Sequence, residues 1–323
     1  MRALTALIAM ALLVAGCGGG SDSADDEAPP PARAQDFPEP QGKPLRALLA
    51  DLGKGPVLAP SGQQFLTGRQ RFGFALFRRD RSQITDASVA VYVAPAGGRP
   101  AEGPYLARYE SLAVTPQFQS RQTASDPNAA KSIYTTEIPF DKPGRYELIG
   151  AARQGGKLVA ATTPMPGIVV EDPSKDRIPA VGSTPPRIHT PTVASVGGDV
   201  ESIDTRLPAS SMHDVDFADV LGKKPVMLLF ATPQLCQSRV CGPVVDVAEQ
   251  VKAKLGGDDA AFIHMEVFRN NRIDDGIRPQ LAAFHLASEP WLFVFARSGK
   301  VSTRIEGAFS ERELEQAIAR TKG

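Results

Sequence analysis

The stretch PVMLLFATPQLCQSRVCGPVVDVAEQV, residues 225–251, decides the fold of the C-terminal part of the chain. It begins with a continuous apolar run, Val226–Phe230, which has the length and composition of a buried strand. Apolar residues then recur at helical spacing over Gly242–Leu255. Between these two patterns lie Cys236 and Cys241. The stretch therefore predicts a strand, a cysteine-bearing loop and a helix.

Strand and helix patterns continue to alternate after this stretch. In order, they are a strand over Phe262–Phe268, a short helix over Pro279–Leu286, a hairpin of Trp291–Phe295 and Val301–Ile305, and a final helix opened by the capping box of Ser310 and Glu313. This order predicts an α/β domain, a sheet with crossover helices.

The order of elements resembles that of thioredoxin, and three local matches support the resemblance. The first strand leads to Cys241-Gly242-Pro243 at a helix start, Pro290 precedes an apolar strand as the family's cis-proline does, and 299–310 is similar to the last hairpin and helix start. The matches cover about residues 215–321. The resemblance implies a thioredoxin-like domain, which we place at residues 213–323.

The position of Cys241 favours a reactive thiol. A thiol just before a helix lies near unpaired backbone N–H groups and the positive end of the helix dipole, and both stabilise a thiolate. Pro243 suits the first turn, where its missing N–H is not needed, and Arg239 adds positive charge. We therefore expect Cys241 to attack and Cys236, five residues upstream, to resolve a mixed disulfide. The alternative is a permanent disulfide, which is common in exported proteins.

Two departures from the family pattern bear on activity. The family's second cysteine falls where this chain has Val244, so the pair is spaced by four residues rather than two. The family's buried acid falls near Leu229, which does not titrate. Glu289 is a candidate to act as a general base or to raise a thiol pKa by repulsion. It is otherwise a solvated loop carboxylate.

The same loop also resembles those of peroxiredoxins and of Sco-type copper-delivery proteins, in which cysteines lie at this turn. A Cu(I) site would add a histidine to the thiolates of Cys236 and Cys241, because soft ligands select Cu(I). The candidates are His285 and His264, although His264, which shares a strand face with Glu266, is also typical of a core histidine. A further alternative is a thioredoxin fold that serves only as a binding scaffold.

The first sixteen residues predict a signal peptide, because a positive start is followed by an apolar run too short to span a bilayer. The run ends in Val14-Ala15-Gly16-Cys17, which resembles the lipobox of bacterial lipoproteins and implies a lipid on Cys17. An ordinary secretory signal with a chance cysteine is the alternative. Residues 17–44 are rich in Gly, Ser, Asp and Pro and predict a disordered tether. We therefore expect a membrane-anchored, extracytoplasmic protein.

Between 45 and 170, period-two apolar runs are broken by turn clusters, which favours an all-β sandwich of immunoglobulin-like type. This segment contains no Cys or His, so it is expected to be a spacer or docking module. Residues 171–212 hold five prolines before Pro208 and predict an extended linker.

The composition limits the partners. Hydrophobic residues make up 42% and charged residues 22% of the chain, which is typical of globular proteins. Lys plus Arg and Asp plus Glu both number 36, so no net charge favours nucleic acid. The sequence thus predicts a thiol-disulfide exchange protein without a cofactor, acting on envelope proteins that carry thiols or disulfides.

Overall fold

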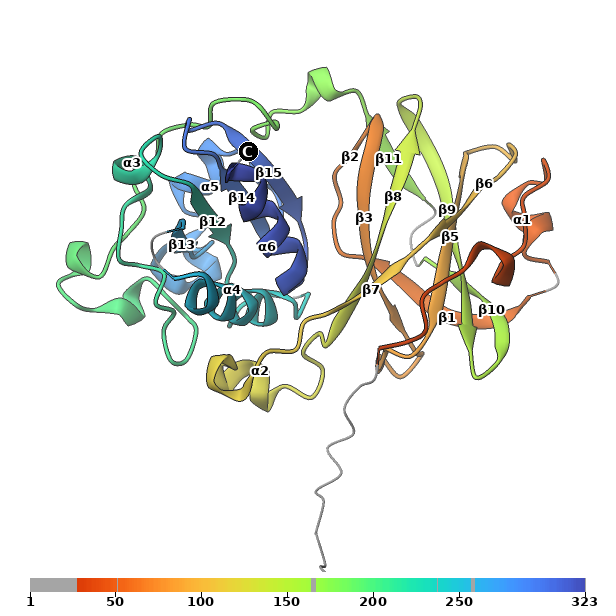
Figure 1. Cartoon of the computed structure of the whole chain (residues 1–323), viewed down its shortest axis with the longest axis horizontal. Coiled ribbons are helices and arrows are strands. Elements are labelled where there is room, and N and C mark those ends of the chain that lie inside the picture. Colours follow the sequence, from red (N-terminus) through yellow and green to blue (C-terminus); the bar gives the residue numbers. More distant parts are fainter. Residues whose placement is uncertain (1–27, 51, 164–166, 237, 257–258, 323) are drawn as a thin grey trace, which may run out of the picture.

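The computed structural model describes residues 28–322, except 51, 164–166, 237 and 257–258. The expected signal peptide and Cys17 lie outside the described residues. The chain forms two domains that lie side by side, an all-β domain and an α/β domain (Figure 1).

The N-terminal domain is built from eleven strands joined in one hydrogen-bonded sheet. The strands are β1 (Gly53–Pro60), β2 (Phe65–Leu66), β3 (Gly68–Phe77), β4 (Gln83–Ile84), β5 (Ser88–Pro95), β6 (Glu102–Leu106), β7 (Arg108–Ser111), β8 (Ser132–Phe140), β9 (Gly144–Gln154), β10 (Lys157–Thr162) and β11 (Ile168–Glu171). The order along the sheet is β2-β11-β9-β10-β1-β3-β8-β7, with β5 on the other edge of β9 and β6 beside β5. Most pairs are antiparallel, but β1 with β10 and β2 with β11 are parallel.

The apolar residues of the predicted alternating runs fill this domain's core. Phe72, Phe74 and Leu76 of β3 share one buried cluster with Val89, Val91 and Val93 of β5, because side chains two residues apart face the same side of a strand. The expected all-β character is therefore confirmed. The immunoglobulin-like type stays a prediction.

Residues 28–44, which we expected to be disordered, pack against the sheet. Phe37 is 5% exposed and shares a buried cluster with Tyr92 of β5 and with the short helix α1 (Leu45–Leu48). The Tyr92 hydroxyl donates to Pro38 O at 2.7 Å, and Arg153 Nη2 donates to Asp36 O at 2.7 Å. The tether expectation is thus corrected for these residues. Their few apolar side chains cover the outer face of β5, which would otherwise be open to water.

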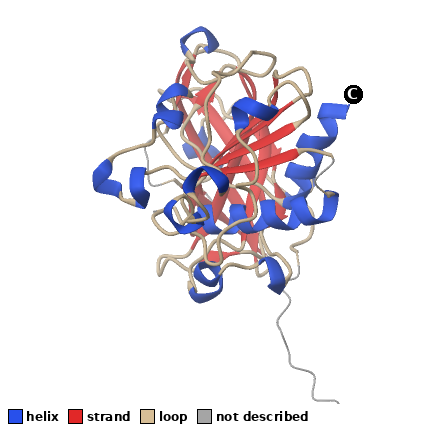
Figure 2. Ribbon diagram, turned by 90° about the vertical axis from the view of Figure 1, so that its left-hand side faces the viewer, coloured by secondary structure: helices blue, strands red, loops and turns tan. Residues whose placement is uncertain are grey.

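The C-terminal domain has the order of elements that the resemblance implies. Its four-stranded sheet runs β13 (Ala261–Met265), β12 (Val226–Phe230), β14 (Trp291–Phe295) and β15 (Val301–Glu306), with β12 and β13 parallel and the other pairs antiparallel. The helices α4 (Cys241–Leu255) and α6 (Glu311–Ala319) cover one face, while α3 (Phe217–Val220) and α5 (Pro279–Ala283) lie on the other. Figure 2, which views the molecule from the side of this domain, shows helices around the strands. The predicted capping box of Ser310 and Glu313 is present.

The proline-rich segment 171–212 is not a free connector. Ile178 and Ile188 are buried in the core that α3 and α5 cover, and Gly182 N donates to Val301 O at 2.8 Å. Asp204, Thr205 and Arg206 are each at most 7% exposed. The expected extended linker is corrected to a segment that wraps the C-terminal domain, because its isoleucines and polar side chains find buried partners there.

A segment of the N-terminal domain, residues 112–131, reaches across to the C-terminal domain. It carries the short helix α2 (Arg121–Ser125), which lies beside α4 (Figure 1). Leu112 at its start and Ile133 of β8, just after its end, are buried in the same cluster as the apolar face of α4. The two domains therefore share part of a hydrophobic core.

A buried acid adds a polar contact between the domains. Glu110 of β7 is 4% exposed and accepts hydrogen bonds from Ser310 Oγ at 2.6 Å and from Arg312 Nε at 3.1 Å. Arg71 of β3 makes a two-pronged contact with Glu313, at 2.7 and 2.9 Å. These bonds fix the start of α6 against the N-terminal sheet.

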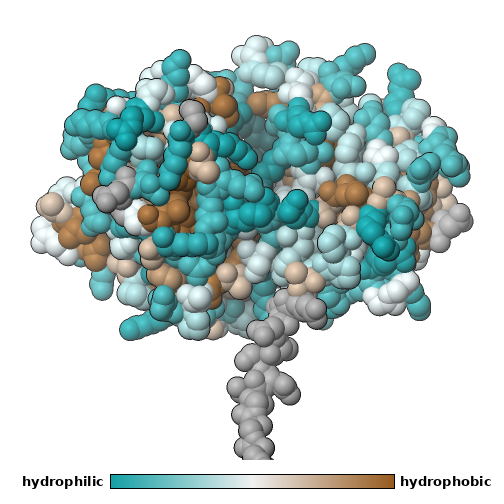
Figure 3. Space-filling model, viewed as in Figure 1, coloured by the Kyte–Doolittle hydropathy of each residue, from teal (hydrophilic) through white to brown (hydrophobic). Residues whose placement is uncertain are grey.

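None of the described helices has the length and hydropathy needed to cross a bilayer. On the face shown in Figure 3, hydrophobic residues are interspersed with hydrophilic ones.

Packing of residues 28–44 can be tested with Phe37→Ala. Truncating this buried ring should lower the free energy of unfolding by about 3 kcal/mol, because it leaves a cavity beside Tyr92. Val181→Ala is the control, since Val181 is 63% exposed. Urea denaturation checks both variants, and equal midpoints for the two would show that the segment is not packed.

Candidate functional site

The two cysteines lie together where the resemblance predicts a reactive site. Cys236 and Cys241 form a disulfide, with Cα atoms 6.0 Å apart. Cys241 is the first residue of α4 and is fully buried, at 0% exposure, whereas Cys236, in the loop after β12, is partly exposed. Cys236 Sγ also lies 3.1 Å from Ser238 Oγ. A molecule approaching from solvent therefore meets Cys236 first.

Glu289 is the carboxylate at this disulfide. Its Oε2 lies 3.6 Å from Cys241 Sγ and accepts a 2.7 Å hydrogen bond from Thr232 N. Burial raises the pKa of Glu289 to about 7, although the bond from Thr232 opposes the shift. This carboxyl can therefore hold or release a proton next to a sulfur near neutral pH.

The other predicted site residues surround the pair. Pro290 is buried and follows a cis peptide bond, as the resemblance implies. Gly242 lets α2 approach, because a Cβ there would come within 2.9 Å of Thr123 Oγ1. Arg239 is exposed, with a positive φ of 59°, and its carbonyl accepts a 3.2 Å hydrogen bond from Ala130 N. Residues 112–131 thus form a wall beside the cysteine loop.

A second buried carboxyl lies behind the loop. Glu266 is 1% exposed, and its Oε1 accepts bonds from Thr205 N and Thr205 Oγ1 at 2.7 and 2.8 Å. No partner of Glu266 Oε2 is found among the described residues. Burial raises the pKa of Glu266, and Glu266 in turn contributes to the raised pKa of Glu289. The two acids are therefore electrostatically coupled beneath the disulfide.

The position of the family's buried acid holds Leu229, which is buried as expected. Its register partner on β13 is His264, which is also fully buried and lies 2.9 Å from Ala231 O through Nε2. Titratable groups thus reach the underside of the site from β13 and from the residue before Pro290, rather than from β12.

Asp246 on α4 joins three parts of the chain. It is fully buried; its Oδ1 accepts a 2.8 Å bond from Arg206 Nε, and its Oδ2 accepts bonds from Ser120 N and Oγ at 3.1 and 3.2 Å. Arg206 also donates to Phe118 O and Pro208 O, each at 2.7 Å. The helix that carries Cys241 is therefore held both by residues 112–131 and by the wrapping segment.

The structure does not bring a histidine to the cysteines. Among the described residues, Glu289 completes a group with Cys236 and Cys241 whose ligand atoms lie within 4.8 Å of one another. His285 is exposed and lines a different cavity, beside Trp291. This arrangement does not fit the copper ligand set expected from sequence, since the third group is a hard carboxylate rather than an imidazole.

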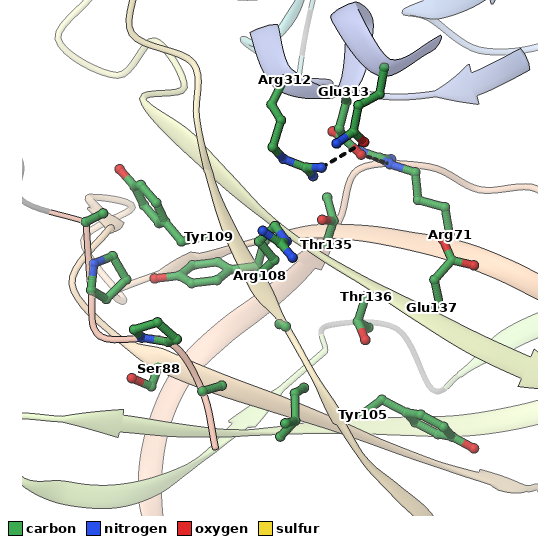
Figure 4. A pocket seen from close by; sticks show the side chains of 18 of the residues that line it. Arg71, Ser88, Tyr105, Arg108, Tyr109, Thr135, Thr136, Glu137, Arg312 and Glu313 are labelled. Carbon is green, nitrogen blue, oxygen red and sulfur yellow. Dashed lines mark hydrogen bonds and ion pairs between the residues drawn. The ribbon is translucent and has the colours of Figure 1, made fainter. Parts of the chain in front are cut away.

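A cavity of about 1030 Å³ lies between the domains, away from the cysteines (Figure 4). It is bounded by β7 and β8 on one side and by β15 and α6 on the other. Figure 4 shows Arg108 and the two tyrosines Tyr105 and Tyr109 below the Arg71–Glu313 pair. No residue of the cysteine loop lines this cavity. It is therefore separate from the disulfide.

Sequence reasoning missed the contributions of the wrapping segment and of residues 112–131. No sequence motif links the cysteines to the residues in and next to these two segments, which are Asp204, Arg206, His213 and Ser120. One signal was present: an Asp-Thr-Arg triplet at residues 204–206 and a histidine at 213 stand in a segment otherwise rich in proline.

The chain shows limited similarity to known proteins. No protein-family model matches the chain, and no curated protein matches it. Among solved structures, a thiol:disulfide interchange protein of the thioredoxin family from Chlorobium tepidum TLS is 17% identical over 43% of this chain and 96% of that chain, with a TM-score of 0.32. A thioredoxin-like superfamily protein is 20% identical over 35% of this chain and 88% of that chain, with a TM-score of 0.28.

The anchoring of α4 can be tested with Arg206→Ala. Removing the guanidinium leaves the Asp246 carboxyl buried without its charged partner, so the free energy of unfolding should fall by about 3–5 kcal/mol. Arg33→Ala is the control, because it removes an exposed Arg–Asp pair and should change stability little. Denaturant titration of both variants measures the difference, and equal stabilities would contradict the role of Arg206.

Proposed function

We propose that this chain is an extracytoplasmic, lipid-anchored thiol-disulfide exchange protein that acts on envelope proteins. The observation that carries the activity is the disulfide at the start of α4, with one partly exposed cysteine, one buried cysteine and a carboxyl against the buried sulfur. The anchor rests on the resemblance around Cys17, and the site of action follows from it, because disulfides persist outside the cytoplasm.

The exposure of the two cysteines favours an order of attack opposite to the one expected from sequence. A substrate thiolate attacks Cys236 Sγ, which forms a mixed disulfide and breaks the Cys236–Cys241 bond. The electron pair of that bond goes to Cys241 Sγ, which takes a proton from neutral Glu289. A second substrate thiol then attacks the substrate sulfur of the mixed disulfide and releases Cys236. The substrate dithiol leaves as a disulfide and the protein as a dithiol; the reverse sequence reduces a substrate.

Two features of the fold suit this role. The helix start stabilises the Cys241 thiolate as a leaving group through its unpaired N–H groups and dipole. The wall formed by residues 112–131 leaves Cys236 as the accessible sulfur. The all-β domain then acts as a docking module that shapes access to the pair, which extends its expected role as a spacer.

The reduction potential of the pair tests this function. A potential between about −120 and −270 mV, the range of exchange enzymes, supports it, whereas one well below about −300 mV identifies a permanent staple. Insulin reduction provides the activity readout, and both single serine variants should abolish it. In the order proposed here, a mixed disulfide accumulates on Cys236 of Cys241→Ser, while Cys236→Ser reacts slowly. A mixed disulfide trapped only on Cys241 would reverse the proposed order of attack without removing the exchange function.

The role of Glu289 predicts a pH dependence. The neutral carboxyl supplies the proton to Cys241, so the rate of reduction by a small dithiol, divided by the dithiol's thiolate fraction, should fall as pH rises through about 7. Glu289→Gln should lower this rate roughly 10²-fold at pH 6 and flatten the profile. Stopped-flow measurement of Trp291 fluorescence or of dithiol oxidation gives the rates. Glu306→Gln is a matched control, and an unchanged profile in Glu289→Gln would contradict the role.

A further inference from the structure

A cluster of ligating side chains lies behind the redox site and takes no part in the exchange proposed above. It consists of Asp204 from the wrapping segment, His213 directly after that segment and His264 from β13, with exposures of 2%, 2% and 0%. Their ligand atoms lie within 4.8 Å of one another. Side chains from separate parts of the sequence therefore converge on one buried point.

The distances in this cluster match a metal site. Asp204 Oδ2 lies 3.0 Å from His213 Nε2 and 3.4 Å from His264 Nδ1. Ligands of a tetrahedral ion, at bonds of about 2.0–2.1 Å, stand about 3.3 Å apart. The second distance also exceeds the usual N–H···O range of about 2.7–3.2 Å. A direct hydrogen bond thus describes that contact poorly.

The surrounding bonds orient Asp204 and His264 as metal ligands require, whereas His213 Nδ1 has no partner among the described residues. His264 Nε2 faces Ala231 O at 2.9 Å, which places the proton on that nitrogen and leaves Nδ1 free to ligate. Asp204 Oδ1 accepts a 2.8 Å bond from Arg206 N, and its Oδ2 accepts one from Ser210 N at 2.6 Å. Ser210 Oγ lies 3.2 Å from His264 Nδ1 and is therefore a close neighbour of this nitrogen.

We propose that Asp204, His213 and His264 form a binding site for a divalent transition-metal ion, and that the ion is zinc. Two imidazoles and one carboxylate, without sulfur, suit Zn²⁺ better than Cu(I) or the alkaline-earth ions. The ion ties the wrapping segment to β13 directly beneath Ala231, where the chain leaves β12 for the cysteine loop. Its role is to fix the base of that loop, and it binds whether or not the cysteine pair is redox-active.

The competing arrangement is a metal-free ion pair. In it, Asp204 raises the pKa of His264 to about 9 against the lowering effect of burial, so the imidazole stays protonated. A protonated imidazole cannot ligate, which makes the two arrangements exclusive and distinguishable.

The experiment measures zinc bound by the full chain. Protein stripped with a chelator is incubated with Zn²⁺, freed of unbound metal by gel filtration and analysed for metal by mass spectrometry. We expect about one ion per chain, a higher unfolding temperature, and visible absorption typical of tetrahedral coordination when Co²⁺ replaces Zn²⁺. Absence of bound metal, with a protonated His264 seen by NMR, would overturn the site.

Variants locate the ion. Asp204→Asn and His213→Gln should each lose zinc binding. His189→Gln should retain it, because His189 forms a similar pair with Asp216 at the exposed surface. The double variant Cys236→Ser, Cys241→Ser should also retain it; zinc lost only in that variant would place the metal on the cysteines. If a ligand variant does not fold, the Co²⁺ spectrum of the wild-type protein still decides between the two arrangements.

Discussion

The placement of α4, the helix that begins at Cys241, depends on a buried charge. Asp246 lies on the buried face of α4, where an unpaired carboxylate would be costly, and Arg206 and Ser120 offset that cost. One partner comes from the segment that wraps the C-terminal domain and the other from the all-β domain. Both contact the helix that begins at Cys241, so the surroundings of the site are built by the whole chain rather than by the α/β domain alone.

The chemistry of the site follows from an uneven distribution of exposure and charge. Cys236 is accessible, Cys241 is sealed, and the acid beside Cys241 is neutral at moderately low pH because Glu266 and burial disfavour its charge. In a site with two equally exposed sulfurs, solvent would supply the proton and either sulfur would be attacked. In the exchange proposed above, Cys236 would meet the substrate and Cys241 would be the leaving sulfur. The resemblance implies a buried acid near Leu229; in this chain Glu266 and Glu289 are the acids close to the disulfide.

The local sequence pattern predicted the elements whose structure depends on residues close together in the chain. The strand Val226–Phe230, the helix that follows Cys241, the hairpin and the capping box of Ser310 all appear where periodicity and caps placed them. Proximity of Glu289 to the cysteines was also predicted, from its place before Pro290. The packing of residues 28–44 and of the wrapping segment was not, because a proline-rich composition does not show which few apolar or charged side chains find partners. His213 and Asp204 come close to His264 only in the tertiary structure, so their spacing in the sequence does not predict this cluster.

Residues 28–44, which pack against the all-β domain, would limit the reach of a lipid-anchored molecule. If Cys17 carries a lipid, the chain between the anchor and the first described residue, Ala28, spans at most about 40 Å even when fully extended. A free tether running to residue 44 would have allowed more than twice that radius. Contacts between the domains hold the cysteines in a fixed position relative to Ala28. The anchored protein would therefore keep its cysteines within a thin layer next to the bilayer. Its targets would then be proteins whose thiols come close to the membrane surface.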